Sequence, residues 1–302
     1  SIMKKKLNKK PLVSIIVNCL NGSEFLYLAL KSVKNQTYKN FEVIFWDNKS
    51  SDNSKSIFRS FRDKRFKYFL SKKRTTLYEA RNLALLKAKG EFISFIDTDD
   101  LWNKNKLQLQ IPLFNDRNVG VVYSKLWILN NTSGKKKIYI KGDLPGGYIF
   151  DKLIKNYYVG IITTIIRKKT LLKLDRKFNK EYTHIGDFDL FLRISKISKF
   201  IPVQKPLATW RTHGKNLTII EKNKSIFELE SWLKKNKRSL SENNYLHVKS
   251  LIDFRKMIYF RMNSQYLNCL KIFFNVHNLK VSLKKIIIIF LPIFILKKIF
   301  WY

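Results

Sequence analysis

Two kinds of apolar segment alternate along the first part of this chain. From residue 12 to residue 123, short runs of β-forming residues are separated by longer segments with apolar residues at helical spacing. This alternation predicts an α/β fold with a Rossmann-like, mostly parallel sheet covered by helices. The predicted strands are 12–17, 41–46, 66–70, 92–96 and 119–123, and the predicted helices are 24–34, a segment from residue 51, 77–89 and 103–114. Gly90 is expected to be the C-cap of the third helix.

Polar side chains stand where several predicted strands end. Asn18, Asp47 and Asp97 each follow or close such a strand. Ligands of open α/β sheets bind outside the carboxyl ends of the strands. The sequence therefore predicts a binding site at this edge of the sheet.

Three carboxylates follow the fourth predicted strand within four positions. Asp97, Asp99 and Asp100 belong to the segment GEFISFIDTDDLW, residues 90–102. Unpaired buried carboxylates are costly, whereas a hard cation such as Mn²⁺ or Mg²⁺ prefers oxygen ligands. Asp97 and Asp99 are the candidate metal ligands, although an isolated pattern of this kind is more often a solvated turn. Asp100 is expected to orient the loop or cap the next helix, and Trp102 to pack beneath the loop.

A second acidic element, HIGDFDLFLRIS, occupies residues 184–195. On a helix, Asp187 and Asp189 point about 200° apart, so they cannot share one role. Asp189 precedes Arg193 by four residues and predicts an ordinary intrahelical ion pair. Asp187, at the start of the helix, is predicted to face a cleft, and a simple N-cap is the alternative.

The later part of the chain is less regular and more basic. Residues 125–145 suit a hairpin or loop, and short helices are predicted at 147–155 and 168–174 around a buried strand at 161–166. Basic helices are expected at 225–237 and 241–276. We therefore expect three regions: a basic arm (1–10), an α/β domain (11–220) and a basic helical extension (221–302).

The last residues, 284–302, read KKIIIIFLPIFILKKIFWY. Their apolar core is about half the ~20 residues that span a bilayer. Lysine pairs bracket this core, and Trp301 and Tyr302 end it, which favours contact with an anionic membrane surface over packing on the protein. Packing as a C-terminal helix is the alternative.

Charge and cysteine content restrict the partners and the compartment. The chain has 60 Lys and Arg against 22 Asp and Glu, a net charge of +38, which favours an anionic partner unless biased codon usage explains the lysines. Cys19 and Cys269 form no disulfide framework, and the basic arm lacks the apolar stretch of a secretory signal. We expect a cytoplasmic protein at the inner face of the cell membrane.

Four segments together resemble the family 2 glycosyltransferases, which have the GT-A fold. The resemblance covers about two thirds of the chain, and the order and spacing of the segments make it specific. The segments are VSIIVNCLNGSEFLYLALKSVKNQTYKNFEVIFWDNKSSDNS (13–54), EARNLALLKAKGEFISFIDTDDLW (79–102), IGDFDLFLRIS (185–195) and WRTHGKNLT (210–218).

This resemblance implies a site for a nucleotide-sugar donor. Asn18 and Asn21 would lie near the nucleobase and ribose, and Asp47 would accept a hydrogen bond from the base. Asn48 stands where many relatives have a second acid. Arg81 would reach phosphate oxygens or pair with Asp97.

The resemblance also implies the catalytic parts. Asp97 and Asp99 would bind the metal that holds the donor diphosphate, and Arg211, His213 and Asn216 would close over that diphosphate. Asp187 falls at the general base that deprotonates the acceptor hydroxyl. Most relatives have Glu where Gly186 stands here.

The implied function is an inverting, metal-dependent glycosyltransferase of the hexosyltransferase type. It would move a sugar from a nucleotide diphosphate donor, with UDP expected, to a hydroxyl of a lipid-linked or cell-surface polysaccharide acceptor. A polyprenyl-phosphate acceptor is an alternative within the family. A basic nucleic-acid-binding α/β protein is an alternative of another class, but only the charge supports it, because the sequence has no RNP-like aromatic pair, G-x-x-G loop or helix-turn-helix. We expect no nucleic-acid partner.

Overall fold

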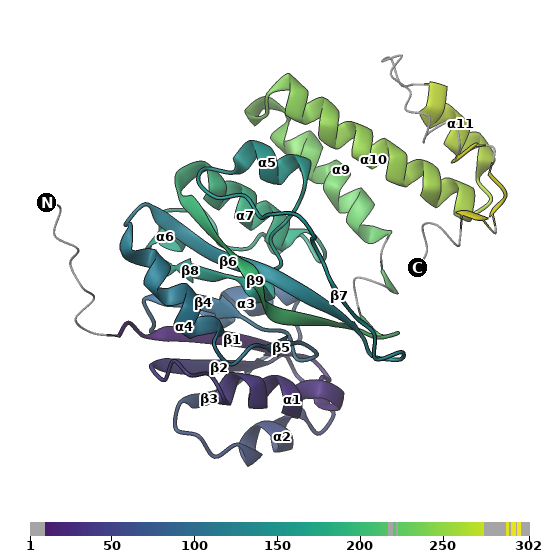
Figure 1. Cartoon of the computed structure of the whole chain (residues 1–302). Helices are drawn as coiled ribbons and strands as arrows, with labels where there is room; N and C mark the ends of the chain where they lie inside the picture. Colours follow the sequence, from purple (N-terminus) through teal and green to yellow (C-terminus); the bar gives the residue numbers. More distant parts are fainter. Residues whose placement is uncertain are drawn as a thin grey trace, which may run out of the picture. The chain divides into compact units, whose positions relative to one another are not determined.

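The chain divides into two compact units, Ser1–Asn216 and Leu217–Tyr302. The computed structural model describes residues 10–216, 220–221, 223–274, 288–289, 291–293 and 295–296. The first unit is built on a nine-stranded sheet, and the described part of the second is helical (Figure 1). The predicted basic arm, apart from Lys10, lies outside the described residues.

Four parallel strands form one half of the sheet, in the order β3-β2-β1-β4. They are β1 (Val13–Cys19), β2 (Phe41–Asp47), β3 (Phe66–Leu70) and β4 (Phe92–Phe95). The helices between them are α1 (Ser23–Lys34), α2 (Ser54–Ser60) and α3 (Leu77–Leu85), and α1 and α2 lie together beside this half (Figure 1). Cys19 pairs with Asp47 and Asp47 with Leu70, so the carboxyl ends of three strands are adjacent.

The other half of the sheet mixes strand directions. The order continues through β8 (Ile165–Arg167), β6 (Val119–Asn130), β9 (Lys199–Thr212) and β5 (Leu101–Trp102), and β7 (Lys136–Ile138) pairs with β6. The long strands β6 and β9 run parallel along one another (Figure 1), whereas β4–β8, β6–β8 and β5–β9 are antiparallel. Because β5 directly follows the acidic loop, its pairing with β9 brings that loop to the end of β9.

The remaining helices of this unit are short, apart from the last. They are α4 (Lys106–Gln110), the 3₁₀ helix η1 (Ile111–Asn115), α5 (Phe150–Lys155), the 3₁₀ helix η2 (Ile161–Thr163), α6 (Lys168–Leu172) and α7 (Gly186–Ile197).

The predicted α/β fold class is confirmed, but several local predictions were wrong. Residues 161–163 are a 3₁₀ turn and not the start of a strand, because the hydroxyls of Thr163 and Thr164 bond back to the carbonyls of Gly160 and Ile161. The strand predicted at 119–123 continues to Asn130, and β9 was not predicted.

The prediction for Gly90 was also wrong. Helix α3 ends at Leu85, so Gly90 is not its C-cap. It is needed because the chain passes against β1: a Cβ at position 90 would lie 2.6 Å from the backbone nitrogen of Ser14 and 2.7 Å from the carbonyl oxygen of Leu12. The Gly90 N–H also donates to Ser14 Oγ at 2.8 Å.

The second unit consists of helices α9 (Lys224–Asn236), η3 (Lys237–Ser239), α10 (Glu242–Met262) and α11 (Tyr266–Phe274). The single helix predicted for 241–276 is interrupted, because Ser264 adopts a left-handed conformation with φ of 59°. That break lets α11 fold back to α10.

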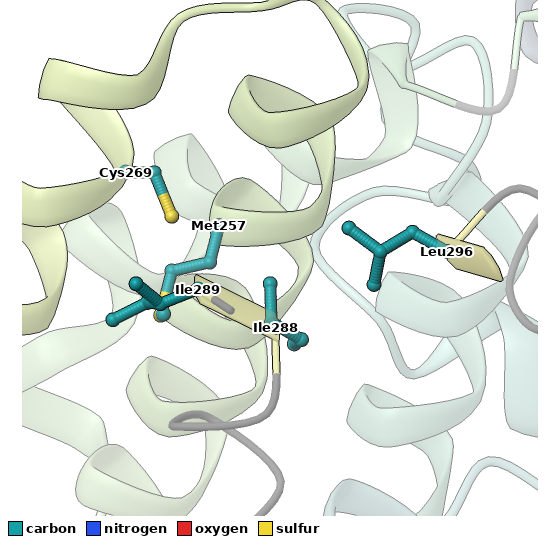
Figure 2. Packing of buried hydrophobic residues seen from close by; sticks show 5 residues of the cluster. All are labelled: Met257, Cys269, Ile288, Ile289 and Leu296. Carbon is teal, nitrogen blue, oxygen red and sulfur yellow. The ribbon is translucent and has the colours of Figure 1, made fainter. Parts of the chain in front are cut away.

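Three apolar residues of the tail are packed within this unit. Ile288, Ile289 and Leu296 are buried in a cluster with Met257 of α10 and Cys269 of α11 (Figure 2). The Arg261 guanidinium donates to the carbonyls of Ile288 (3.2 Å) and Leu291 (2.9 Å). The packing alternative is thus realised at these positions, whereas the rest of 284–302 lies largely outside the described residues. Membrane contact by the tail stays a prediction, and no helix in the described part of the chain has the length and hydropathy to cross a bilayer.

Replacing Gly90 with Ala should destabilise the first unit. The added methyl would press on backbone atoms of β1, which cannot move aside as a flexible side chain can. We expect a loss of about 1–3 kcal/mol in the free energy of unfolding, measured by urea denaturation. Gly142→Ala is the matched control, since nothing lies within 4 Å of its Cβ position, and an equal loss in both variants would contradict the close approach.

Candidate active site

The acidic loop after β4 is fixed by its third carboxylate. Asp100 is 2% exposed, and its Oδ1 accepts the backbone N–H of Arg211 at 2.9 Å. Burial and the neighbouring Asp99 and Asp97 raise the pKa of Asp100 well above its usual range. The buried Trp102 indole donates to the Ile162 carbonyl at 2.9 Å. Of the two roles predicted for Asp100, the bond to Arg211 is that of a residue that orients the loop, and Trp102 is buried as expected.

Residues at the end of β9 and just after it contact Asp99. His213 Nε2 and Asn216 Nδ2 each lie 3.0 Å from Asp99 Oδ2, and Arg211 Nε donates to the Asp99 carbonyl at 3.0 Å. His213 Nδ1 accepts the backbone N–H of Lys215, so Nε2 carries the proton that is donated to Asp99. Burial and Asp97 raise the pKa of Asp99, and His213 opposes them. The structure thus gathers Arg211, His213 and Asn216 at the acidic loop.

Asp97 is paired with a buried arginine. Arg81 Nη2 lies 2.7 Å from Asp97 Oδ1, and Arg81 is buried whereas the Asp97 side chain is 37% exposed. The rings of Tyr78, Phe95 and Phe178 lie 5.4–5.8 Å from the guanidinium carbon. Burial alone would lower the pKa of Arg81, but Asp97, Tyr78 and Asp187 outweigh it and raise that pKa. Of the two predicted contacts, the structure has the ion pair with Asp97.

Asp187 lies in the first turn of α7, where two tyrosines bind it. The Tyr78 hydroxyl donates to Oδ1 at 3.2 Å and the Tyr157 hydroxyl donates to Oδ2 at 3.1 Å. Burial raises the pKa of Asp187, and Arg81 acts against that increase. The N-cap is Ile185, so Asp187 does not cap the helix.

Asp189 has the separate role that its helical position predicted. It is buried, and its Oδ2 lies 2.9 Å from Arg193 Nη2. The predicted intrahelical pair is confirmed.

At the ends of β1 and β2, two predicted donor-site residues hold loops. Asp47 is buried, with Oδ1 accepting the Ser50 N–H at 2.7 Å and Oδ2 accepting the Tyr68 hydroxyl. Asn21 adopts φ of 54°, and its Oδ1 accepts the Ser51 N–H at 2.8 Å. Both residues lie at or just after the carboxyl ends of β1 and β2, where the binding site is predicted. They hold the loop at Ser50 and Ser51 in place.

Asn18 has no such partner. Within the described structure, both polar atoms of its buried side-chain amide lack a hydrogen bond. Its register partner on β2, Trp46, likewise has an unpaired indole N–H. Buried polar groups are normally paired, so two neighbouring exceptions at a strand end suit a site that a polar ligand completes.

Comparison with known proteins shows the family of this chain. Residues 14–193 match the profile described as Glycosyl transferase family 2. This chain belongs to glycosyltransferase family 2. It is 36% identical over 185 residues (61% of this chain, 70% of the relative) to the UDP-Glc:alpha-D-GlcNAc-diphosphoundecaprenol beta-1,3-glucosyltransferase WfgD of Escherichia coli. It is 30% identical over 209 residues (65% and 68%) to the amylovoran biosynthesis glycosyltransferase AmsB of Erwinia amylovora.

Solved structures share the fold of this glycosyltransferase. The mannosyltransferase PcManGT of Pyrobaculum calidifontis, solved with GDP-Man and Mn²⁺, has a TM-score of 0.61 at 15% identity, over 88% of this chain and 74% of that one. TarS of S. aureus, residues 1–349 solved with UDP, has a TM-score of 0.58 at 24% identity, over 66% and 60%. The predicted GT-A fold is thereby confirmed.

The acidic loop of the glycosyltransferase offers oxygen ligands for a cation. In the described part of the chain, no group of three or more His, Cys, Asp or Glu side chains is arranged to hold a metal ion. Mg²⁺ sites of nucleotide enzymes use one or two carboxylates together with substrate phosphates, so the donor set of Asp97 and Asp99 fits such a shared site. The half-exposed Asp97 has its Oδ1 on Arg81, which leaves Oδ2 as the oxygen available for a cation.

Tyr78 and Tyr157 were missed by the sequence analysis. Tyr78 precedes Arg81 by three residues on α3 and so shares its helix face, which was a usable signal. Tyr157 lies between α5 and η2 in a segment without regular structure, and no local pattern marks it.

Asp52 links the starts of α1 and α2, and its loss should weaken the fold in a pH-dependent way. It accepts the backbone N–H groups of Ser23 and Ser54, at the starts of α1 and α2. Burial would raise its pKa, but the hydrogen bonds from Ser54 and Ser23 outweigh burial and lower the pKa of Asp52 to about 2. Because the pKa is depressed in the folded state, this stabilisation is present above about pH 4 and is lost as pH falls towards 2.

We therefore expect Asp52→Ala to lose about 1–2 kcal/mol of unfolding free energy at pH 7. The difference from the unmodified chain should shrink between pH 4 and pH 2, measured by urea denaturation at each pH. Asp143→Asn is the control: the side chain is 86% exposed, and the amide keeps an oxygen acceptor for Lys125 Nζ, which lies 3.5 Å away. It should change stability by less than about 0.5 kcal/mol. If the loss of unfolding free energy in Asp52→Ala is constant over this pH range, the stabilising role of the ionised Asp52 is contradicted.

Proposed function

We propose that this glycosyltransferase moves a sugar from a UDP-linked donor, with inversion, to a hydroxyl of a lipid-linked diphosphate acceptor in polysaccharide biosynthesis. The observation that carries the proposal is that two residues of α3 contact the two acids: the buried Arg81 pairs with Asp97 at 2.7 Å, and Tyr78 donates to Asp187 at 3.2 Å. A candidate base and a candidate diphosphate site therefore belong to one polar network. The names of the relatives WfgD and WfaP, both diphosphoundecaprenol glucosyltransferases, support the acceptor class.

The chain's own residues supply the chemistry of an in-line displacement. Asp187 takes the proton of the acceptor hydroxyl while that oxygen bonds to the anomeric carbon, and the bond from this carbon to the diphosphate breaks with its electron pair leaving on the diphosphate. The raised pKa of Asp187 suits a general base, since catalytic bases work best when their pKa approaches the working pH. Asn18 would meet the donor through its unpaired amide.

A divalent cation is part of this proposal. Asp97 and Asp99 would hold Mn²⁺ or Mg²⁺, which when bound neutralises charge on the leaving diphosphate. Arg211 and His213 would keep the loop in place for it through their contacts with Asp99. The solved neighbour with GDP-Man and Mn²⁺ supports a cation in this fold.

The polyprenyl-phosphate alternative is less well supported. A phosphate acceptor is already ionised and needs no base, whereas Asp187 is held by two hydroxyls and burial raises its pKa, which suits proton transfer. No feature of the described residues favours nucleic acid beyond the overall charge.

Asp187→Asn tests the proposed base. The amide keeps the size of the side chain but cannot take a proton, so we expect transfer to fall by roughly 10²–10⁴-fold while UDP binding in the presence of Mn²⁺ is kept. Transfer is measured with a panel of UDP-sugars and a synthetic lipid carrying GlcNAc-diphosphate, and binding by calorimetry.

Asp189→Asn is the neighbouring control, because Asp189 pairs with Arg193 and has no proposed role in transfer. It should reduce stability while transfer by the folded fraction persists. Equal transfer by Asp187→Asn and the unmodified chain would refute the base, and no transfer by the unmodified chain from any UDP-sugar would refute the proposed function.

We also propose that the second unit holds the enzyme at the inner face of the cell membrane, close to a lipid-linked acceptor. Residues 217–302 contain 16 Lys and Arg against 5 Asp and Glu. On α11, Leu267 and Phe274 are each 74% exposed, and the exposed Lys271 lies between them on the same helix face. An apolar face with lysines is typical of helices that lie at a membrane surface.

Replacing Lys284, Lys285, Lys297 and Lys298 with Gln tests this attachment without removing the buried tail residues. Each lysine near an anionic surface contributes about 1 kcal/mol, so binding to phosphatidylserine-containing vesicles should fall at least about tenfold in sedimentation. Binding to neutral vesicles should be weak for both proteins. The control replaces four exposed lysines of the first unit, Lys64, Lys89, Lys137 and Lys141, and an equal loss there would show a general charge effect only.

A further inference from the structure

The Asp187 carboxylate is bound on both sides by phenol hydroxyls. Tyr78 donates to Oδ1 at 3.2 Å from α3, and Tyr157 donates to Oδ2 at 3.1 Å from the segment after α5. The two oxygens are thus held by side chains 79 residues apart in sequence. A carboxylate held at both oxygens has a defined plane.

The Tyr78 ring is fixed by its surroundings. It is 3% exposed and stacks on Phe178 at 5.3 Å between ring centroids. Its other neighbour is the backbone of Gly186: a Cβ at position 186 would lie only 2.5–2.7 Å from three atoms of the ring. The missing side chain at Gly186 is therefore what admits this ring beside Asp187.

Tyr157 is held less firmly. It is partly exposed and lies in residues 156–160, which have no helix or strand. Its ring meets the edge of Phe188 at 5.5 Å and 72°. A partly exposed residue of an irregular segment can change position at a lower cost than one packed between a ring and a backbone.

We propose that Tyr78 is a fixed positioning residue for Asp187, and that Tyr157 is an exchangeable partner that gives up Oδ2 to the acceptor hydroxyl. This inference rests on the proposed function, in which Asp187 is the base. The acceptor proton then passes to Oδ2 as the acceptor oxygen bonds to the anomeric carbon and the diphosphate leaves with the electron pair. Tyr78 keeps Oδ1 throughout and preserves the plane of the carboxylate.

The two tyrosines should differ in their effects on the pH dependence of transfer. The profile of kcat/KM reports ionisations of the free enzyme, and that of kcat reports those of the substrate complex. The groups facing Asp187 are Arg81 and Tyr78 of α3, Tyr157 and the backbone N–H of Phe188. Removing a hydrogen bond to the ionised carboxylate raises the pKa of Asp187. The acid limb of the pH–rate profile, where activity falls as the base becomes protonated, therefore moves to higher pH.

The test uses Tyr78→Phe and Tyr157→Phe in the full chain, with UDP-glucose and a GlcNAc-diphosphate lipid as substrates. Tyr78→Phe should move the acid limbs of both kcat and kcat/KM upward by about one pH unit, because its bond exists in both states. Tyr157→Phe should move only the acid limb of the kcat/KM profile, because its bond exists only in the free enzyme. It should also lower the acceptor KM at neutral pH, since no tyrosine hydroxyl then competes with the acceptor for Oδ2.

Gly186→Ala is an independent variant that leaves both hydroxyls in the chain. Its methyl group would displace the Tyr78 ring, so the acid limbs of the kcat and kcat/KM profiles should both move as they do in Tyr78→Phe. The double variant Gly186→Ala/Tyr78→Phe should show no further shift, because both changes remove the same hydrogen bond. Tyr148→Phe, at a ring that is 61% exposed, is the control and should match the unmodified chain. Melting curves and UDP binding establish that each variant is folded.

The possible outcomes test the roles of the two tyrosines separately from the proposed role of Asp187 as the base. Transfer retained by Asp187→Asn would overturn the proposed base. If Asp187→Asn is inactive but Tyr78→Phe moves neither limb, the positioning role of Tyr78 is overturned alone. A shift of both limbs by Tyr157→Phe would show that its bond persists in the complex, which would overturn the exchange.

Discussion

The site depends on one hydrogen bond between distant parts of the chain, from the Arg211 N–H to the buried Asp100 carboxylate. A carboxylate in this position is costly without a donor, so the acidic loop can keep its shape only when β9 lies beside it. The pairing of β5 with β9 places that donor. Just after the same strand end, His213 and Asn216 contact Asp99 Oδ2. Two sequence segments more than a hundred residues apart thus act as one structural element.

Arg81 has the corresponding role on the other side of the loop. Its guanidinium is buried among aromatic rings and has Asp97 as its ion-pair partner. Burying an arginine is tolerable when a carboxylate and polarisable rings replace its water. Because the same cation favours the ionised form of Asp187, it limits how far burial raises the pKa of that group. The balance of burial against one shared cation is what allows several acids to occupy a small region with different protonation behaviour.

The sequence predicted the parts of the site that depend on local pattern. Asn18, Asp47 and Asp97 were placed at one edge because parallel strands end together, and the register of β1 with β2 has this arrangement. The prediction from sequence failed for β9, which contains Pro202 and Pro206 and pairs with β6 through register shifts. Prolines and bulges remove the alternation that marks a strand. Tyr157 could not be predicted either, since its contact with Asp187 comes from tertiary folding and an apolar role would give the same local sequence.

The tail illustrates why an apolar run has two interpretations that local pattern cannot separate. Residues 286–296 suit a bilayer boundary and a protein core equally well, because both environments remove side chains from water. The structure assigns Ile288, Ile289 and Leu296 to a core with Met257 and Cys269. That packing leaves Leu267 and Phe274 exposed on α11, where they form an apolar surface. The tail and the membrane proposal are therefore compatible: the buried residues support the helix whose opposite side would meet the lipid, and the bracketing lysines add attraction to anionic headgroups.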